Sequence, residues 1–343
     1  MRLFARWTSW LVLPCVLMLR SAGAADGPIR VGIIGLDTSH VTAFTNGFKK
    51  AGEGSELAGV QVVAAYPGGS PDVDASRTRI AGFTQKLKDG GVEIVDSVEA
   101  LLPKVDAILL ESCDGRPHLK QARIVFAANE HAKHKLPMFI DKPIAASLAD
   151  VLEIFRLAEA SGTPCFTSSS LRYDPAIVAL HDSEKYGSIL GCDANSPCAL
   201  EPHHPDLFWY GIHGVETLFT VMGPGCETVS CAATKETHFA TGVWKDGRIG
   251  TFRGLRAGKE GYGVFVYGTK ANGPCEPVKA GYDPLLAQIA KFFRTGKPPV
   301  SAAETIELVA FMQAASDSLQ HHGEAIKISD VIAAARQENE HRK

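Results

Sequence analysis

The sequence predicts an α/β protein with a Rossmann-type doubly wound parallel sheet, followed by an α+β domain with a large open, mostly antiparallel sheet. Short buried apolar segments alternate with helical segments up to about residue 168, which is typical of a parallel sheet. The stretch 31–40 (VGIIGLDTSH) has the strand, glycine turn and helix start of a nucleotide-binding βαβ unit. Beyond residue 172, extended segments follow one another with turn residues such as Asp246 and Gly247 between them, which indicates an antiparallel sheet.

The first 24 residues are expected to be a Sec-type signal peptide rather than part of the fold. Arg2 and Arg6 precede an apolar core at residues 10–19, and residues 22–24 (AGA) fit a cleavage site with small side chains. The core is too short to span a bilayer. Because no twin-arginine pair is present, we expect export of the unfolded chain to the periplasm or the extracellular space.

Composition and charge exclude several classes of function. Removing the leader takes Lys and Arg from 35 to 32 against 38 Asp and Glu, a formal net charge of about −6. Such a surface offers no basic field for nucleic acid, and no second apolar stretch is long enough to span a membrane. The cysteines after the leader form no C-x-x-C pair, so neither a thiolate zinc site nor a redox motif is expected. Two pairs, Cys192 with Cys198 and Cys226 with Cys231, are close enough in sequence to bond, and their pairing stays open.

The first domain is expected over residues 25–170. Small and β-branched apolar residues fill its strands, which are expected at residues 31–34, 60–65, 91–94, 107–110, 137–140 and 165–168. Helices are expected at residues 41–50, 97–102, 117–129 and 148–160. Pro117 fits a first helical turn and Gly162 a helix end, which fixes two of these bounds.

The second domain is expected over residues 171–328. A helix at residues 175–184 precedes extended segments at 228–233, 240–244, 248–253 and 262–267. Helices return at residues 284–293 and 303–319, and residues 325–328 fit an edge strand. A short helix and a frayed tail are expected over residues 329–343.

The dinucleotide fingerprint G-x-G-x-x-G is damaged. Gly32 lies in the first strand and Gly35 holds the first position, but Asp37 replaces the second glycine and His40 the third. At the second position the backbone normally comes close to the pyrophosphate of the cofactor, and a carboxylate there would repel it. The second strand also lacks the terminal acid that binds an adenosine ribose, and a turn-rich loop at residues 66–71 follows it. We therefore expect no cofactor-binding residue here and keep NAD(P) as the alternative.

Six short pieces of sequence occur together in a characteristic order. They are residues 31–35 (VGIIG), 141–143 (DKP), Arg172, 211–213 (GIH), 266–270 (VYGTK) and 296–299 (GKPP). In this order the mature chain resembles the Gfo/Idh/MocA oxidoreductase family, which has Glu-Lys-Pro in place of the DKP tripeptide.

The resemblance implies more than a fold. It implies an NAD(P)-dependent sugar oxidoreductase, or a glycoside hydrolase that uses NAD, with Lys142 and His213 as acid–base residues beside the nicotinamide ring. It also implies a homo-oligomer formed through the open sheet. The family often has an aspartate where this chain has Trp209.

Polar side chains gather where the predicted parallel strands end, and such ends face one crevice. The expected metal ligands there, and on the helix after residue 211, are Asp37, His40, Glu111, His213 and Glu216. Carboxylates and imidazoles packed together repel one another unless a cation shares the site, and zinc suits mixed His and carboxylate ligands. His203 and His204 are further candidates. The structural alternatives are Asp37 as a helix cap and His40 as a packed side chain.

The function expected from these residues is metal-assisted proton transfer on a small hydroxy acid or sugar derivative. Lys142 would remove a proton and His213 would return one, as in a racemase, an epimerase or a lyase. Arg172 would bind the substrate carboxylate, and Asp141, His118 and Tyr210 are further expected substrate contacts. Two alternatives stay open, an NAD(P)-dependent oxidoreductase or hydrolase and a carbohydrate-binding protein without activity.

Overall fold

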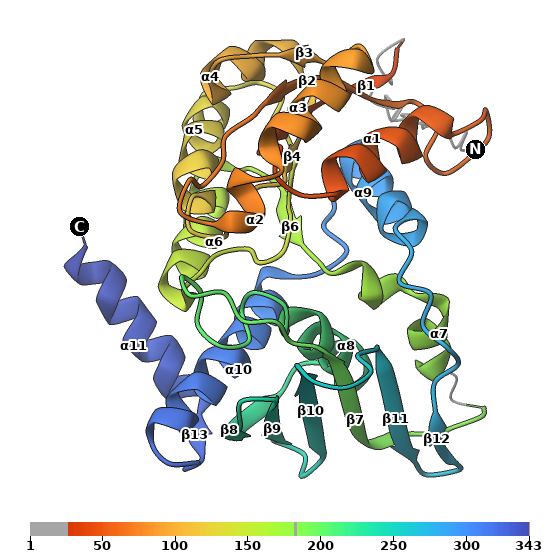
Figure 1. Ribbon diagram of the computed structural model, residues 1–343, viewed down its shortest axis with the longest axis vertical. Coiled ribbons are helices and arrows are strands. Elements are labelled where there is room, and N and C mark those ends of the chain that lie inside the picture. Colours follow the sequence, from red (N-terminus) through yellow and green to blue (C-terminus); the bar gives the residue numbers. More distant parts are fainter. Residues whose placement is uncertain (1–26, 182–183, 343) are drawn as a thin grey trace, which may run out of the picture.

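The computed structural model describes residues 27–181 and 184–342. The expected signal peptide, residues 1–24, lies outside the described residues. Two sheets dominate the structure, one near each end of the molecule's longest axis (Figure 1).

The first sheet is parallel and has six strands in the order β3-β2-β1-β4-β5-β6. These strands are β1 (Ile29–Ile34), β2 (Val60–Tyr66), β3 (Glu93–Ile94), β4 (Ala107–Leu110), β5 (Met138–Ile140) and β6 (Cys165–Thr167). The order reverses between β1 and β4, so the ends of these two strands flank the crevice of a doubly wound sheet. This confirms the expected Rossmann-type fold.

Helices connect these strands and cover both faces of the sheet. They are α1 (His40–Lys50), α2 (Asp74–Arg77), α3 (Ile80–Asp89), α4 (Val98–Leu101), α5 (His118–Glu130) and α6 (Leu148–Ser161). Helices α2 and α3 were not predicted, because residues 74–89 carry few apolar side chains and only Leu87 of α3 is buried.

The second sheet has seven strands in the order β12-β11-β7-β10-β9-β8-β13. They are β7 (Ile189–Pro197), β8 (Cys226–Ala233), β9 (Thr237–Trp244), β10 (Ile249–Leu255), β11 (Gly263–Gly268), β12 (Asn272–Pro274) and β13 (Ile326–Lys327). Only β7 and β10 pair in parallel, so the sheet is mostly antiparallel, as expected. Strand β7 was not predicted, since Gly191, Asn195 and Pro197 are residues that strands disfavour.

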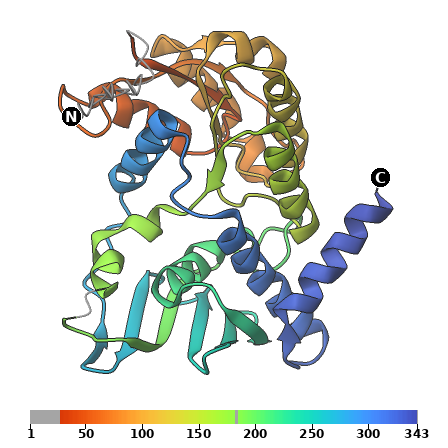
Figure 2. The ribbon, with the colours of Figure 1, turned by 180° about the vertical axis from the view of Figure 1, so that it is seen from behind.

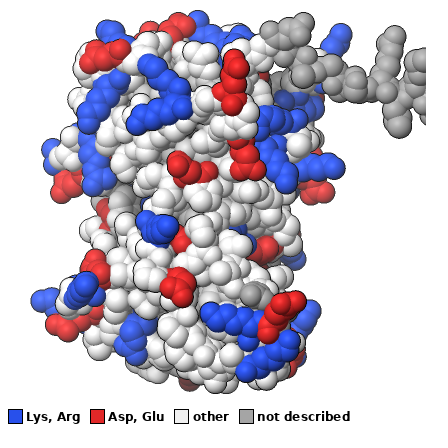
Figure 3. Space-filling model, turned by 90° about the vertical axis from the view of Figure 1, so that its right-hand side faces the viewer, with Lys and Arg blue, Asp and Glu red and all other residues white. Residues whose placement is uncertain are grey.

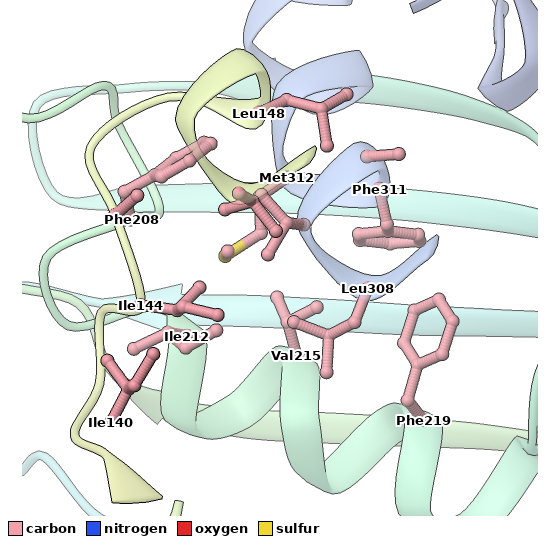
Figure 4. Close-up of a cluster of buried hydrophobic side chains, with 14 of the residues drawn as sticks. Ile140, Ile144, Leu148, Phe208, Ile212, Val215, Phe219, Leu308, Phe311 and Met312 are labelled. Atoms are coloured by element: carbon pink, nitrogen blue, oxygen red, sulfur yellow. The ribbon is translucent and has the colours of Figure 1, made fainter. Parts of the chain in front are cut away.

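Helices α8 (Ile212–Met222) and α10 (Ala302–Gln320) cover the inner face of this sheet. Their apolar side chains meet side chains from β5 and α6 of the first domain, so one core joins the two domains (Figure 4). The residues labelled in that core are Ile140, Ile144, Leu148, Phe208, Ile212, Val215, Phe219, Leu308, Phe311 and Met312. The outer face of the sheet stays partly apolar, with Leu190 and Ile249 about half exposed.

Two C-terminal helices return to the first domain. Helix α9 (Asp283–Thr295) packs Leu285 and Leu286 into the core around α1 (Figure 1). Helix α11 (Ile328–His341) runs beside the first domain (Figure 2), and Asn339 donates a 2.7 Å hydrogen bond to the Ala149 carbonyl oxygen. The expected frayed tail is therefore wrong up to residue 341, because this contact with α6 holds the helix.

The surface carries charges of both signs. Figure 3 shows Lys and Arg interspersed with Asp and Glu over one side of the molecule, without a large patch of one sign on that side. Among the described helices, none is long and apolar enough to cross a membrane. This mixture of charges agrees with the nearly equal numbers of basic and acidic residues in the sequence.

Candidate active site between the two domains

A cavity of about 360 Å³ lies where the two domains meet. The first domain lines it with the start of α1, with Arg79 and with Lys142, which follows β5. The second domain contributes Tyr210 and His213 at the start of α8. This position matches the crevice predicted at the C-terminal ends of the parallel strands.

Two larger depressions lack this chemistry. One of about 850 Å³ lies between α6, α10 and α11, and one of about 600 Å³ lies on the second sheet. Neither is lined by a histidine, and neither lies at the C-terminal edge of the parallel sheet. The smaller interdomain cavity is therefore the candidate site.

Three buried side chains form a compact group of potential metal ligands at the cavity, where His40 is part of the wall and the two acids lie behind it. They are His40 at the start of α1, Glu111 after β4 and Asp141 after β5. Their ligand atoms all lie within 4.8 Å of one another. His40 Nδ1 lies 2.6 Å from Asp141 Oδ2 and 3.9 Å from Glu111 Oε2. The group shares two of the five expected ligands and adds Asp141, which was expected to contact substrate.

Glu111 is the unusual member of this group. Its side chain is fully buried, and neither carboxylate oxygen has a hydrogen-bond partner among the described residues. Burial and then the charge of Asp141 raise the pKa of Glu111 well above its usual range. A buried carboxyl group without a partner is costly, and a divalent cation would satisfy both of its oxygens. The donor set of one imidazole and two carboxylates suits zinc, and its two negative charges match a divalent ion.

Lys142 and His213 come together on the cavity wall, as the sequence predicted. The Lys142 backbone N–H donates a 2.8 Å hydrogen bond to Asp141, which ties the lysine to the ligand group. His213 Nδ1 lies 2.7 Å from the Ser169 hydroxyl, so Nε2 is the ring nitrogen left for a ligand. Burial, followed by the charges of Lys142 and His40, lowers the pKa of His213 well below its usual value. The histidine is therefore a neutral imidazole at neutral pH.

Aromatic residues complete the wall. The Lys142 ammonium lies 5.5 Å from the centre of the Tyr210 ring, and the hydroxyl oxygens of Tyr210 and Tyr262 are 3.3 Å apart. Trp209 and Tyr282 line the same space. Tyr210 thus lies where substrate contact was expected. Tyr262 and Tyr282 were missed, because they come from loops that carry no recognisable motif.

Asp37 lies outside the ligand group. Its carboxylate is fully buried and accepts hydrogen bonds from the Ser76 hydroxyl at 2.6 Å and from the Cys113 backbone N–H at 2.8 Å. It therefore joins the turn after β1 to α2 and to the loop after β4. It does not belong to the group of potential metal ligands around His40. It also does not cap α1, whose first turn receives no side-chain cap.

The backbone N–H groups of the first two residues in the turn after β1 are hydrogen-bonded within the chain. The backbone N–H of Gly35 donates to the Tyr66 carbonyl oxygen at 2.9 Å, and that of Leu36 donates to Pro67 at 2.8 Å. A Cβ at Gly35 would lie 2.3 Å from the Ser112 hydroxyl oxygen, so this glycine serves close packing with the loop after β4. The buried Asp37 carboxylate adds a negative charge beside the same turn. A carboxylate at this position makes the turn a poor site for a dinucleotide phosphate.

Glu216 and Arg172 form an ion pair with each other. Arg172 Nε lies 2.7 Å from Glu216 Oε1, and its Nη1 lies 2.7 Å from Glu304 Oε1. Glu216 also accepts hydrogen bonds from Ser168 and from the Ser169 backbone. The expected roles of Arg172 with a carboxylate and of Glu216 with a metal are therefore not supported, because α10 supplies a competing acid.

The remaining histidine candidates lie away from the cavity wall. His118 is fully buried, with its ring nitrogens 2.8 Å from the Ser112 carbonyl oxygen and 3.1 Å from that of Ile144, so it contacts no substrate. His204 binds Glu201 and lies 3.2 Å from Asp114, and His203 is paired with the same Glu201. Both histidines therefore belong to an interdomain network.

All cysteines in the described part of the chain are free thiols. Neither of the two pairs that are close in sequence is bonded, and burial raises the pKa of the Cys226 and Cys231 thiols to about 12. They are thus small core residues without reactive character.

No family model matches the chain, and no curated protein matches its sequence significantly.

Solved structures match the chain over most of its length. GenD2 from gentamicin A biosynthesis, in complex with NAD, superposes with a TM-score of 0.71 at 14% identity, covering 90% of this chain and 99% of its own. A probable dehydrogenase from Thermotoga maritima gives 0.71 at 19% identity, covering 88% and 100%. An oxidoreductase from Agrobacterium radiobacter, in complex with NAD+, L-tartaric acid and magnesium, gives 0.68 at 14% identity, covering 88% and 99%.

Identities this low establish a shared fold rather than a shared activity. A six-stranded parallel sheet followed by a mostly antiparallel sheet is common to the chain and to these oxidoreductases. The chain therefore has the fold of the Gfo/Idh/MocA-type oxidoreductases, as its sequence motifs predicted.

Proposed function

We propose that this protein is a metal-dependent proton-transfer enzyme, a racemase, epimerase or lyase, acting on a small hydroxy acid or sugar derivative. The observation that carries the proposal is Glu111, a fully buried carboxyl group that forms no hydrogen bond with any described residue, beside His40 and Asp141. These three side chains would hold the metal, and zinc is the favoured ion. When bound, it would supply Lewis-acid polarisation of a substrate oxygen.

Lys142 and His213 would move the proton. Both line the cavity, and His213 has one ring nitrogen engaged by Ser169 and the other free to accept a proton. A racemase needs one base on each face of the substrate carbon, and Lys142 from the first domain and His213 from the second would alternate as base and acid on opposite faces. Tyr210, packed against the lysine ammonium, would help to orient it.

The proposal includes loss of NAD use. The backbone donors of Gly35 and Leu36 are engaged by the chain itself, and Asp37 brings a buried negative charge to the same turn. Both N–H groups thus have carbonyl acceptors within the chain, in place of the oxygens of a pyrophosphate. Export through a Sec-type leader, which we also propose, would further separate the protein from cytoplasmic NAD.

The second candidate is an NAD(P)-dependent oxidoreductase. The observation that favours it is the fold of the solved neighbours, some of which are in complex with NAD. In that case Lys142 and His213 would transfer a proton beside the nicotinamide ring. Denatured protein would then release a nicotinamide chromophore, which the first proposal does not allow.

The outer face of the second sheet would bind a second copy of the chain. Leu190, Ile249, Phe265 and Tyr267 are each more than a third exposed on strands β7, β10 and β11. Apolar side chains gathered on one sheet face are typical of an interface between protein chains. We therefore propose a homo-oligomer, and light scattering of the purified protein would show a monomer if this is wrong.

Solvent deuterium exchange tests the proposed reaction. The purified protein is incubated in D2O with 2-hydroxy acids and keto sugars, and NMR follows the proton on the α-carbon. L-Tartrate is included because it is the acid bound by one solved neighbour. We expect exchange that a chelator abolishes and zinc restores. Turnover without exchange, or released nicotinamide, would favour the oxidoreductase.

A further inference from the structure

The described wall of the interdomain cavity is positively charged. Arg79 and Lys142 line it, and none of its lining residues is Asp or Glu. The carboxylates of Glu111 and Asp141 lie behind the wall, where they are 0% and 2% exposed. A divalent metal held by that group would neutralise the two carboxylates, so they would not offset the positive charges of Arg79 and Lys142. An anionic ligand therefore fits this cavity better than a neutral one.

Arg79 is free to bind such a ligand. Its side chain is exposed, and no carboxylate of the described residues is ion-paired with it. Its neighbour Arg77, also exposed, lies 2.6 Å from Asp74, and Arg172 is held by two glutamates. Among these arginines, only Arg79 lines the cavity without an acidic partner.

The protein fixes the backbone that carries Arg79. The buried Ser76 hydroxyl donates to Asp37 and accepts a 2.8 Å hydrogen bond from the backbone of Ser70. These bonds hold α2 against the turn after β1, and Arg79 precedes α3 directly. The acid that replaces a glycine in the fingerprint thus positions an arginine at the cavity.

Hydroxyl groups line the same space. Tyr210 and Tyr262 are within hydrogen-bond distance of each other, and Tyr282 and Ser39 also contribute to the wall. Phenol and alcohol groups pair well with the hydroxyls of a polyol, and aromatic rings pack against its carbon skeleton. The cavity therefore combines one cationic anchor with several contacts for hydroxyl groups.

We propose that Arg79 is a specificity-determining residue that binds the carboxylate or phosphate of a small anionic polyol. This inference rests on the proposed function in that it names the substrate class of the same cavity. A guanidinium group binds either anion through two parallel N–H···O bonds, which a lysine cannot reproduce.

Calorimetric titration of the purified protein tests this role. The probes are D-gluconate, D-glucose 6-phosphate and D-glucose, and the variants are Arg79→Gln and the matched control Arg77→Gln. One of the two anions should bind wild type more tightly. We expect Arg79→Gln to bind this anion at least about 10-fold more weakly, the usual scale of a lost hydrogen bond to a charged group. Arg77→Gln should bind like wild type, and D-glucose should bind weakly to all three proteins. The preferred anion distinguishes a carboxylate from a phosphate substrate.

Three outcomes would overturn the inference. They are equal anion affinity of Arg79→Gln and wild type, stronger binding of D-glucose than of either anion, and no anion binding to wild type at millimolar concentration. Repeating the titration after chelation separates the two proposals. Anion binding that depends on Arg79 in a protein without metal would leave this inference standing while the metal-dependent reaction fails. Deuterium exchange and anion affinity that are both unchanged in Arg79→Gln would leave the proposed reaction standing while the role of Arg79 fails.

Discussion

Asp37 and Glu111 are both fully buried carboxylates at the C-terminal edge of the same parallel sheet. Asp37, after β1, accepts hydrogen bonds from the Ser76 hydroxyl and the Cys113 backbone N–H. Glu111, after the neighbouring strand β4, accepts none from the described residues. Both side chains are acidic, both are fully buried and both follow a strand of the same sheet, but their hydrogen-bond partners differ.

This difference separates a structural acid from a candidate functional one. Hydrogen bonds within the protein fully account for Asp37, whose removal should cost stability. Nothing in the described part of the chain accounts for Glu111, so its burial implies either a proton or a cation. The same reasoning applies to Arg172 and Arg79: the first is ion-paired with Glu216 and Glu304, and the second has no acidic partner among the described residues.

Substitution of Lys142 should have the largest effect on activity, because this lysine is the proposed base. It tests whether the group of residues around Glu111 serves a reaction. Lys142→Arg keeps the positive charge, but a guanidinium group does not release its proton in a protein. We expect folding and metal content to be unchanged, with deuterium exchange slowed by about 10²-fold or more. Lys120→Arg, an exposed substitution on α5, is the control. Full activity of Lys142→Arg would remove the lysine from the mechanism.

Glu111→Gln should weaken metal binding more than any change at Asp37. The amide keeps the shape of the side chain but removes a charged ligand, so affinity for zinc should fall by about 100-fold. Competition with a fluorescent chelator measures this affinity. Unchanged affinity would place the metal elsewhere or exclude it.

Asp114 extends the comparison to an acid with charged partners. Burial alone would raise its pKa, but hydrogen bonds from His204, Arg116 and Ser70 outweigh burial and lower the pKa below its usual range. A lowered pKa gives stability that is present above the unfolded value, near pH 4, and is lost as the pH falls further. Asp114→Asn should therefore reduce the free energy of unfolding by about 2 kcal/mol at pH 7 and by less at pH 3. Urea unfolding at both pH values measures this, and an equal loss at both would contradict the account.

Asp37→Asn should have the smallest effect, and it should be purely structural. The amide can still accept one hydrogen bond but no longer satisfies both Ser76 and Cys113, so we expect a loss of about 1–2 kcal/mol in the free energy of unfolding. Zinc affinity should stay at the wild-type value. A loss of zinc affinity as large as that of Glu111→Gln would erase the distinction between the two acids.

The fold was predictable because its evidence is local. Alternating buried segments and helices mark the parallel sheet, and turn residues such as Gly247 mark the hairpins of the second domain. The central strand β7 escaped prediction because Gly191 and Asn195 are poor strand formers, and its nine residues are held by pairing with β10 and β11 on both sides. The length of α11 was missed because its stabilising contacts are on α6.

The site was predictable only in part, because partners far apart in sequence decide each role. Lys142 and His213 were expected together, and both line the cavity. No acidic partner for Arg172 was apparent from the sequence, but Glu304 on α10 forms an ion pair with it. Arg79 was missed, since no motif surrounds it and only the docking of α2 brings it to the cavity.

The central claim concerns Glu111, and metal analysis of the purified protein tests it most directly. Mass spectrometry of the metal content should show about one divalent ion per chain in wild type and in Asp37→Asn, and little or none in Glu111→Gln. Metal well below one ion per chain in wild type, together with deuterium exchange that a chelator leaves unchanged, would contradict the account.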